Sequence, residues 1–327
     1  MRILGVLMFD VTIFGASGFI GTRLTKRLAA KGARVVAVDI LPPREIVPGV
    51  SYVSHDVRQA IPTEISPRGS LLYNLAAVHR TPGHPTHEYY ETNVFGALNV
   101  TEFADAIDSH EVVFTSSISI YGPSEDTVDE NTLPAPTSDY GRSKLMAESI
   151  HRRWAAGNEN RRLVVVRPGV VFGPGEKGNY SNLAGALKRG LFAYPGRKTT
   201  IKSGGYVDEL IHALDFAVTQ KAASITFNFA YPSESTTEDI VKAFGRVADV
   251  NTSYPVLPIK PLLAVAWIFE ALSRLGFKNP IHRERIWKLV KSTRIKPAWL
   301  LANGYCFETD VDAALQAWSH ETQGTFT

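Results

Sequence analysis

The sequence contains very little sulfur. It has one cysteine, Cys306, and three methionines in 327 residues. A single cysteine excludes an internal disulfide and a zinc site built from several thiolates, and we expect no bound metal. The lack of disulfides favours a reducing compartment, so we expect a cytoplasmic protein. Residues 1–8 are apolar but too few for a secretory signal peptide.

Long apolar runs are also absent. The longest one beyond the N-terminus, residues 261–269, is bounded by Lys260 and Glu270, whereas a membrane span needs roughly 20 apolar residues. This run is predicted to be a buried helix, with a peripheral membrane contact as the minor alternative, and no stable membrane insertion is expected. The net charge of +3 is too small to indicate a nucleic acid partner, although it leaves room for a local basic site for an anionic substrate.

Short β-rich runs alternate with helical stretches in the first half of the chain. This pattern is typical of an α/β fold with a doubly wound parallel sheet. Long helices are predicted over 86–107 and 139–156, the second capped by Ser138. Strands are predicted at residues 11–14, 34–38, 51–53, 71–75, 112–115 and 163–166.

The chain is expected to divide into two parts. The first, residues 8–175, carries the predicted sheet, and the second, residues 176–327, forms mainly a smaller substrate-binding lobe. Glycine and proline become frequent after Arg167, which marks the change. Residues 200–230 are expected to return to the first part, because 226–229 has the pattern of a further strand of the sheet.

A glycine-rich loop follows the first predicted strand directly and opens a helix. Glycine is needed there because the turn is tight, the backbone approaches a pyrophosphate, and the helix packs closely on the strand. The free N–H groups of the helix N-terminus then favour phosphate. The loop therefore predicts a dinucleotide-binding domain of the Rossmann type, with cofactor contacts from Gly15, Ser17, Gly18, Phe19, Ile20 and Gly21.

The residues at the ends of the next strands indicate which cofactor binds. Asp39 ends the second predicted strand, where a carboxylate accepts both ribose hydroxyls and repels a 2′-phosphate. NAD is therefore predicted, and NADP, which Arg44 would favour, is the alternative. Further cofactor contacts are expected after the third and fourth strands, from Asp56, Val57, Leu75, Ala76 and Ala77. For Asp56, a helix-capping role is the alternative to a cofactor contact.

Tyr140 and Lys144 lie four positions apart in a predicted helix and so share one face. A phenol with an ordinary pKa near 10 is a poor base at neutral pH. A nearby ammonium is expected to lower that pKa by stabilising the phenolate, which suits proton transfer. Taken alone, this common spacing would indicate only a surface pair.

A cluster of hydroxyl groups supports a catalytic interpretation of that pair. Ser116, Ser117 and Ser119 follow the strand predicted at 112–115, at the sheet edge where ligands bind in doubly wound folds. A serine there can hydrogen-bond the substrate oxygen and orient it toward Tyr140.

Together, the glycine loop, the Tyr-Lys pair and the serine cluster resemble the extended short-chain dehydrogenases/reductases of the NAD-dependent epimerase/dehydratase family. The resemblance covers the chain up to about residue 214. It implies Tyr140 as the acid/base, Lys144 as its electrostatic partner and a ligand of the nicotinamide ribose, and Ser117 as the third catalytic member. Ser117 is chosen because it lies four residues before the tyrosine of a Tyr-Gly pair, and Ser116 is the alternative.

The resemblance implies further contacts with the cofactor. Asn93 stands in a Thr-Asn-Val segment where the family has an asparagine near the active site, although a helix-packing role is an equal alternative. Pro168 and the backbone of Val170 stand in the segment that runs past the nicotinamide ring, and both are expected to contact its carboxamide.

The smaller lobe gives weaker indications of the substrate. A diphosphate would suit the Arg197-Lys198 pair and the basic stretch formed by Lys278, Arg283, Arg285, Lys288 and Lys291. The alternative is that these charges form a solvated helix face. Substrate contacts are predicted for His79, Ser117, Ser119, Asn179, Arg197 and Tyr206.

Family resemblance leaves several reactions open. It disfavours a dehydratase, because Ile118 and Ser119 stand where those enzymes carry an acidic pair, and Val170 replaces an asparagine frequent in UDP-galactose 4-epimerases. The favoured function is C4 epimerisation of a nucleotide-diphosphate sugar through a transient keto-sugar. The alternatives are an NAD(P)H-dependent keto-sugar reductase and a 3β-hydroxysteroid-type dehydrogenase, whereas a non-enzymatic cofactor sensor would have lost the tyrosine or the lysine. Relatives commonly dimerise through the two long helices, so a homodimer is expected.

Overall fold

The structure is a computed structural model that describes residues 9–80, 83–274 and 283–327. Its centre is a seven-stranded sheet with the strand order β11-β7-β5-β4-β1-β2-β3, and every pairing is parallel. The doubly wound sheet is thereby confirmed, and residues 226–229 pair with β7 as predicted. The strands are β1 (Asp10–Phe14), β2 (Arg34–Asp39), β3 (Ser51–Ser54), β4 (Leu71–Asn74), β5 (Glu111–Thr115), β7 (Arg162–Pro168) and β11 (Ser224–Phe229).

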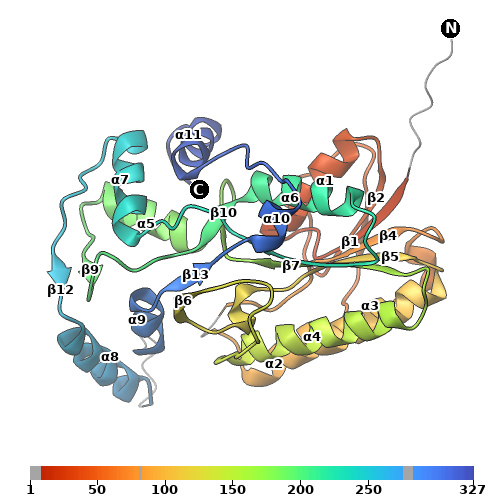
Figure 1. Cartoon of the computed structure of the whole chain (residues 1–327), viewed down its shortest axis with the longest axis horizontal. Coiled ribbons are helices and arrows are strands. Elements are labelled where there is room, and N and C mark those ends of the chain that lie inside the picture. The colour runs from red at the N-terminus through yellow and green to blue at the C-terminus, as the bar shows by residue number, and fades with distance from the viewer. Residues whose placement is uncertain (1–8, 81–82, 275–282) are drawn as a thin grey trace, which may run out of the picture.

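Helices cover both faces of this sheet (Figure 1). Helices α1 (Phe19–Ala30) and α6 (Val207–Thr219) lie on one face, and α3 (Gly96–Ala106) and α4 (Asp139–Ala156) lie on the other. Successive residues of each strand point to opposite faces, and because both faces are covered the strands are apolar almost throughout. In β7, for example, Val164 and Val166 join the cluster under α1 and α6, while Leu163 and Val165 join the cluster under α3 and α4.

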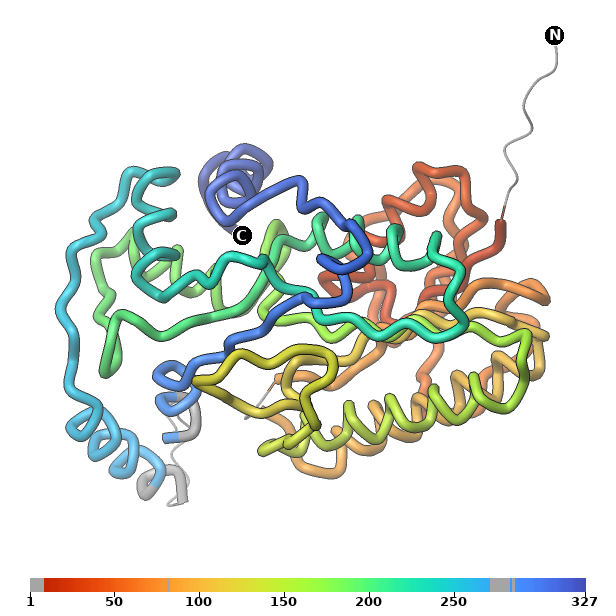
Figure 2. Tube along the Cα trace, in the orientation of Figure 1, coloured from red at the N-terminus to blue at the C-terminus, as the bar shows by residue number. Residues whose placement is uncertain are grey.

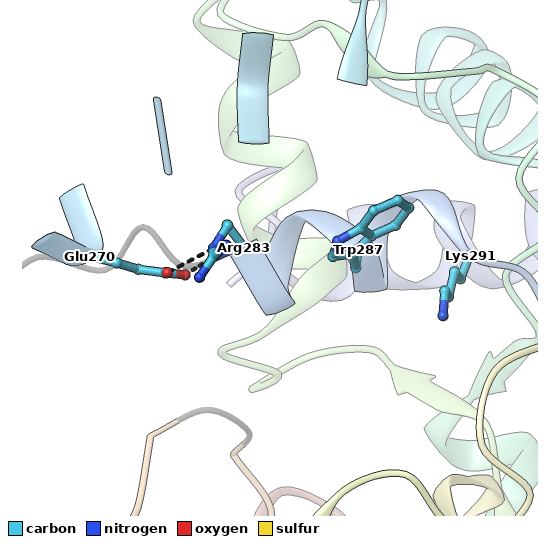
Figure 3. Close-up of a pocket in the computed structure, with 4 residues that line it drawn as sticks. All are labelled: Glu270, Arg283, Trp287 and Lys291. Carbon is cyan, nitrogen blue, oxygen red and sulfur yellow. Dashed lines mark hydrogen bonds and ion pairs between the residues drawn. The ribbon is translucent and has the colours of Figure 1, made fainter. Parts of the chain in front are cut away.

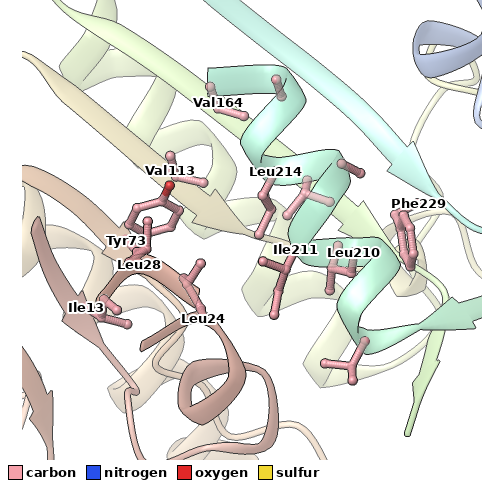
Figure 4. Packing of buried hydrophobic residues seen from close by; sticks show 14 of the residues in the cluster. Ile13, Leu24, Leu28, Tyr73, Val113, Val164, Leu210, Ile211, Leu214 and Phe229 are labelled. Carbon is pink, nitrogen blue, oxygen red and sulfur yellow. The ribbon is translucent and has the colours of Figure 1, made fainter. Parts of the chain in front are cut away.

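Side chains of α1 and α6 pack on the strands of the sheet, including β1, the strand that leads into the glycine loop (Figure 4). Fully burying one such aliphatic side chain contributes about 1.5–3 kcal/mol. The packing of two helices on the same strands therefore fixes where the loop between β1 and α1 lies. The side chains in this contact include Ile13, Leu24, Leu28, Val113, Val164, Leu210, Ile211 and Leu214.

The helix predicted over 86–107 is not one regular α-helix. It consists of α2 (Thr86–Tyr90), a π-helical turn η2 (Glu91–Phe95) and α3. The wider turn brings the amide of Asn93 into the interior, where it is buried. Turns of this kind often mark functional sites, but periodicity alone does not reveal them because all the residues involved suit an α-helix.

The remaining elements form a smaller lobe, seen on the left of Figure 1. Three strand pairs organise it: β10 with β8, β12 with β9, and β13 with β6. Its core is aromatic and includes Phe172, Tyr180, Tyr194, Phe244 and Trp318. The strands are β6 (Ser124–Val128), β8 (Val170–Phe172), β9 (Tyr194–Pro195), β10 (Gly204–Tyr206), β12 (Val256–Leu257) and β13 (Thr293–Ile295). The helices are α5 (Asn179–Lys188), α7 (Thr237–Ala248), α8 (Ile259–Arg274), α9 (Arg283–Val290) and α11 (Val311–Glu321).

The chain passes between the two parts more than once. Strand β6 lies within the first predicted domain, yet it pairs with β13 near the C-terminus. After β13 the trace returns to the sheet (Figure 2), where α10 (Ala298–Ala302) packs on β11. Trp299 of α10 lies 5.7 Å from Phe227 between ring centroids. Two short 3-10 turns, η1 (Thr63–Ile65) and η3 (Ile118–Ile120), complete the described elements.

The apolar run at 261–269 lies in a helix, α8, but the prediction that it is buried is wrong. Val265, Trp267 and Ile268 are exposed, and α8 lies at the outer end of the smaller lobe (Figure 1). An apolar run indicates a surface that water disfavours and does not show what covers it. In the described part of the chain, no helix is both long enough and apolar enough to cross a membrane.

Candidate active site

The glycine loop forms a close-packed cradle where the strand order reverses between β1 and β4. Gly15 has φ +82°, and a Cβ there would lie 2.7 Å from the backbone N of Ala76. A Cβ on Gly21 would lie 2.2 Å from the carbonyl oxygen of Gly15. Gly18 caps α1 without a side-chain hydrogen bond, so the helix N-terminus stays open to an anion. These features fit a dinucleotide pyrophosphate at the switch point of the sheet.

The Gly21→Ala substitution is expected to weaken NAD binding about tenfold or more, equivalent to about 1.4 kcal/mol. The new methyl group would meet backbone atoms, namely the Gly15 oxygen and the Ala16 Cα at 2.8 Å, so the loop itself must move. Calorimetric titration with NAD measures the effect. Gly185→Ala in α5 is the matched control, because its Cβ would meet only the flexible Arg189 side chain at 3.6 Å. Unchanged NAD affinity in Gly21→Ala would contradict this assignment of the loop.

Asp39, the predicted ribose ligand, closes one side of the cradle. Its carboxylate accepts hydrogen bonds from the backbone N–H groups of Ser17 and Leu41, both at 2.9 Å. Arg44 lies at the same rim and donates to the carbonyl oxygens of Ser17 at 3.0 Å and Gly175 at 2.8 Å. Both residues that were predicted to influence the choice between NAD and NADP therefore lie beside the loop.

The other predicted cofactor residues lie in two places. Leu75 and Ala76 pack directly against Gly15, and Ala77 follows them in the chain. Val57 is buried in the core under α3. The Asp56 carboxylate pairs with Arg58 at 2.6 Å, and this hydrogen-bonded pair lowers the pKa of Asp56.

Helix α4 places the two central catalytic candidates. Its N-terminus is capped by Ser138, whose hydroxyl accepts from the Gly141 N–H at 3.1 Å. Tyr140 lies in the first turn, and Lys144 follows one turn later with only 1% of its surface exposed. The Lys144 ammonium lies 4.3 Å from the ring centroid of Phe114, a cation–π contact at the end of β5. The helix therefore carries both groups to the carboxyl edge of the sheet.

Ser117, the predicted third member, follows β5 at this edge of the sheet. Its hydroxyl accepts from the Ser119 N–H at 3.1 Å and donates to the Ser119 hydroxyl at 3.2 Å, which caps the η3 turn. Ser117 also forms a hydrogen bond with Tyr140. Gly141 permits this approach, because a Cβ there would lie 2.4 Å from the Ser119 carbonyl oxygen.

The electrostatics of the site differ from the expectation for the phenol. Burial raises the pKa of Tyr140, and the hydrogen bond with Ser117 opposes that rise. Burial also lowers the pKa of Lys144 to about 7, although the Glu148 carboxylate opposes the change. The predicted lowering of the tyrosine pKa by Lys144 is therefore not found, because desolvation disfavours the charged form of both groups.

Asn93 has a positioning role within the protein. Its amide accepts from the Val78 N–H at 2.9 Å and donates to the Val78 oxygen at 3.1 Å. It also donates to the Ser143 hydroxyl at 2.9 Å. The π turn thus ties the segment after β4 to the turn of α4 between Tyr140 and Lys144. These bonds match the helix-packing alternative, and the role of Ser143 was not predicted.

A buried ionic network behind Lys144 was also missed by the sequence analysis. The Glu148 carboxylate binds the Arg167 guanidinium through two bonds of 2.9 and 2.8 Å. Arg167 also donates to the Tyr121 hydroxyl at 2.6 Å, and Tyr121 in turn donates to Asn228 at 2.9 Å. Burial would raise the pKa of Glu148, but its bonds to Arg167 outweigh that effect and lower it. The spacing of Lys144 and Glu148 along α4 was the available signal.

The predicted substrate residues are dispersed. His79 follows β4 near the catalytic helix, and its pKa is lowered by desolvation and then by the charges of Arg80, His84 and Lys144. Asn179 begins α5. Tyr206 is 4% exposed and packs 5.9 Å from Phe172 in the aromatic core of the lobe.

The segment after β7 has its backbone groups engaged. Pro168 ends β7 and is buried, and the Val170 N–H donates to the Ser203 oxygen at 3.0 Å.

The basic residues predicted to bind a diphosphate have partners within the protein. Arg197 pairs with Glu125 at 2.5 Å and donates to the Val290 oxygen at 3.1 Å. Arg283 pairs with Glu270 at 2.8 Å, whereas Lys278 and the side chain of Arg285 lie outside the described residues.

Comparison with known proteins is consistent with this geometry. Residues 11–230 match the profile of the NAD dependent epimerase/dehydratase family. The chain is 28% identical over 316 residues to an N-acetyl-alpha-D-glucosaminyl-diphospho-ditrans,octacis-undecaprenol 4-epimerase of Escherichia coli O157:H7, covering 94% of each protein. It is 25% identical to a UDP-glucose 4-epimerase of Vibrio cholerae, covering 83% of this chain and 84% of that protein.

Solved structures share the fold. MoeE5 in complex with UDP-glucose and NAD has a TM-score of 0.77 at 22% identity, covering 97% of this chain and 100% of that one. A UDP-glucuronic acid 4-epimerase of Bacillus cereus in complex with NAD has a TM-score of 0.76 at 18% identity, covering 98% and 100%. The family match spans the glycine loop, the serine cluster and the Tyr-Lys pair. The chain therefore belongs to the NAD dependent epimerase/dehydratase family and is an enzyme of the extended short-chain dehydrogenase/reductase type.

Proposed function

We propose that this protein is an NAD-dependent 4-epimerase of a sugar that is joined to a diphosphate, with a nucleotide as the carrier expected from the sequence. The observation that carries the proposal is that Tyr140 interacts with Ser117 while Lys144, one turn further along α4, lies against Phe114 at the carboxyl end of β5. The Escherichia coli and Vibrio cholerae relatives support the reaction, because they are 4-epimerases of a sugar on an undecaprenol diphosphate and on UDP, respectively.

In this mechanism the protein handles the proton. Bound NAD supplies reversible acceptance of a hydride from the sugar carbon. Ser117 holds the C4 hydroxyl oxygen by a hydrogen bond, and Tyr140 takes its proton, which leaves a 4-keto-sugar. After the sugar has turned over, Tyr140 returns the proton to the oxygen on the other face. Hydride and proton both go back to the substrate, so the reaction causes no net oxidation.

Lys144 is the cation assigned to the phenol in this proposal, because an ammonium near a phenolate stabilises it. In the structure burial outweighs that effect and raises the pKa of Tyr140, so the phenol keeps its proton until a bound substrate presents the hydroxyl to be deprotonated. Glu148 helps Lys144 to keep its proton, since its charge opposes the effect of burial. Asn93 and Ser143 hold the same turn of α4 in place.

The test is incubation of the purified protein and NAD with UDP-glucose, UDP-N-acetylglucosamine and the corresponding polyprenyl-diphosphate sugar, with products separated by chromatography. We expect a C4 epimer to form without net NADH. Steady accumulation of NADH would instead indicate a dehydrogenase. Absence of turnover with every sugar would contradict the proposed substrate class.

We also propose that two copies associate through α3 and α4. Phe95, which directly precedes α3, Leu98 of α3 and Met146 of α4 are exposed, with 55%, 39% and 47% of their surfaces accessible. Exposed apolar side chains gathered on one face indicate an interaction surface. Phe95→Asp is expected to convert the dimer to a monomer in size-exclusion chromatography with light scattering, whereas Leu191→Asp leaves it unchanged. A wild-type monomer would contradict the proposal.

A further inference from the structure

Helix α8 presents apolar side chains to solvent. Trp267, Ile268 and Val265 are 58%, 52% and 47% exposed. The helix lies at the outer end of the smaller lobe, away from the central sheet (Figure 1). A soluble surface rarely gathers large apolar side chains in this way unless it meets a partner or a lipid phase.

Neighbouring elements extend the apolar surface. On α9, Trp287 and Leu289 are 44% and 53% exposed, and β12, which leads into α8, exposes its valine and leucine. Helices α8 and α9 are joined by the Glu270–Arg283 ion pair. Two exposed tryptophans on adjacent helices are notable, because indole combines an apolar body with a polar N–H and is enriched at membrane–water interfaces.

Positive charge surrounds this apolar surface. Arg283 and Trp287 of α9 and Lys291, just beyond its end, follow one another at intervals of four and, with Glu270, line a cavity of about 540 Å³ (Figure 3). The Lys291 ammonium lies 5.9 Å from the Trp287 ring centroid. Among the described side chains of residues 256–291, Lys260, Arg283, Lys288 and Lys291 are exposed, against the single carboxylate of Glu270.

The far end of α9 is held by Lys202, which lies just before β10. Lys202 donates to the carbonyl oxygens of Lys288 and Lys291 at 2.5 and 2.6 Å. The β13 strand follows at once and pairs with β6, which begins at Ser124, only a short turn after the Ser117 loop. Through β13 and β6, α9 is therefore connected to the segment that follows the Ser117 turn.

We propose that α8 and α9 dock on an anionic membrane surface, and that the enzyme's sugar diphosphate is carried there on a membrane lipid. The inference rests on the proposed epimerase function and replaces the nucleotide carrier expected from the sequence with a lipid. Apolar helices with interfacial tryptophans and a basic rim bind at the headgroup level without crossing the bilayer. The arginine and lysines suit lipid phosphates and a diphosphate.

The positive charge around α8 and α9 favours an anionic membrane, rather than a second copy of the chain, as the partner of this surface. Two copies that met through α8 and α9 would bring the same basic rims together, and like charges juxtaposed across an interface are costly. An anionic bilayer complements the rim instead, and each lysine or arginine near such a surface strengthens binding about fivefold.

The first test is flotation of the full-length protein with vesicles of phosphatidylcholine alone or mixed with phosphatidylglycerol. We expect binding only to the anionic vesicles, and weaker binding as salt is raised. Lys288→Gln/Lys291→Gln should weaken binding about 25-fold, from about fivefold for each charge, whereas Lys221→Gln/Lys242→Gln should not. Trp267→Ser/Trp287→Ser should abolish binding, and Leu133→Ser, another exposed apolar side chain, should leave it intact.

The second test compares carriers. Wild type and Trp267→Ser/Trp287→Ser are assayed with the same sugar on UDP in solution and on a polyprenyl diphosphate in anionic vesicles. The substitutions should lower turnover of the lipid-linked sugar at least about tenfold, equivalent to about 1.4 kcal/mol, and leave turnover of the UDP-sugar unchanged. The unchanged rate also shows that the variant is folded.

Three outcomes would overturn the docking proposal: no vesicle binding by wild type, binding that ignores both sets of substitutions, or a tryptophan variant that changes only the oligomeric state in light scattering. Equal loss of turnover on both carriers would overturn the lipid-linked substrate. Failure of the proposed function looks different, because vesicle binding would persist while neither sugar is epimerised.

Discussion

Replacement of Tyr140 by phenylalanine is expected to lower kcat for epimerisation by about 10²–10⁴-fold, the usual contribution of a positioned acid/base. The ring and its packing are kept, so only the proton-transferring oxygen is lost. NAD affinity should change little, because the glycine cradle lies on a different element, between β1 and α1. Product chromatography gives kcat, and calorimetric titration gives the affinity for NAD.

Tyr89→Phe is the matched control for this prediction. The Tyr89 ring lies 6.4 Å from the Tyr140 ring, and its hydroxyl donates to the carbonyl oxygen of Arg80. Its loss removes a neighbouring phenol that has no part in the proposed proton transfer, so kcat should stay within about tenfold of wild type, which is less than the contribution of an acid/base. If Tyr140→Phe retained comparable activity, another group would have to handle the proton.

Replacement of Arg167 by methionine is expected to lower the free energy of unfolding by about 3–5 kcal/mol, because it leaves the buried Glu148 carboxylate without its partner. Glu148 is 1% and Arg167 5% exposed. Denaturant unfolding measures the change. Arg152→Met removes the other, more exposed cation beside Glu148, at 3.4 Å, and should cost about 1 kcal/mol or less.

The pH dependence of this loss has a definite sign. In wild type the pKa of Glu148 is lowered below its ordinary 4.5 by Arg167, so the pair contributes stability above that pH and loses it as pH falls further. Without Arg167 the carboxyl can protonate, so the difference between variant and wild type should shrink as pH falls toward and below 4.5. The double variant Glu148→Leu/Arg167→Met should recover much of the lost stability at neutral pH. A deficit that stayed constant with pH would mean that lost packing, rather than the unpaired charge, is responsible.

Local sequence patterns were sufficient to predict the cofactor-binding half of the molecule. The glycine loop directly after β1, the acid at the end of β2 and the apolar strands each depend on neighbours a few residues away, and the structure places them as predicted. The helix over Asp139–Ala156 and its Ser138 cap were also predictable, because a cap and its first turn are consecutive in the chain.

Other features arise only when distant segments meet in the fold. The Glu148–Arg167–Tyr121 network joins α4, β7 and the loop after β5, and no periodicity within any one of them shows it. The π turn at Asn93 was hidden for the same reason, since its amide bonds to Val78 and Ser143 come from other elements.

The chain alone therefore determined the fold class and the position of the glycine loop, and spacing in the sequence was enough to predict a catalytic trio on a particular helix face and strand end. Tertiary structure decided the direction of the pKa shift of Tyr140 and whether α8 is buried or exposed. Desolvation depends on everything packed around a group, and it reversed the expected shift of the pKa of Tyr140. The apolar run in α8 had the composition of a core helix, and only its place at the rim of the fold left Trp267 in solvent.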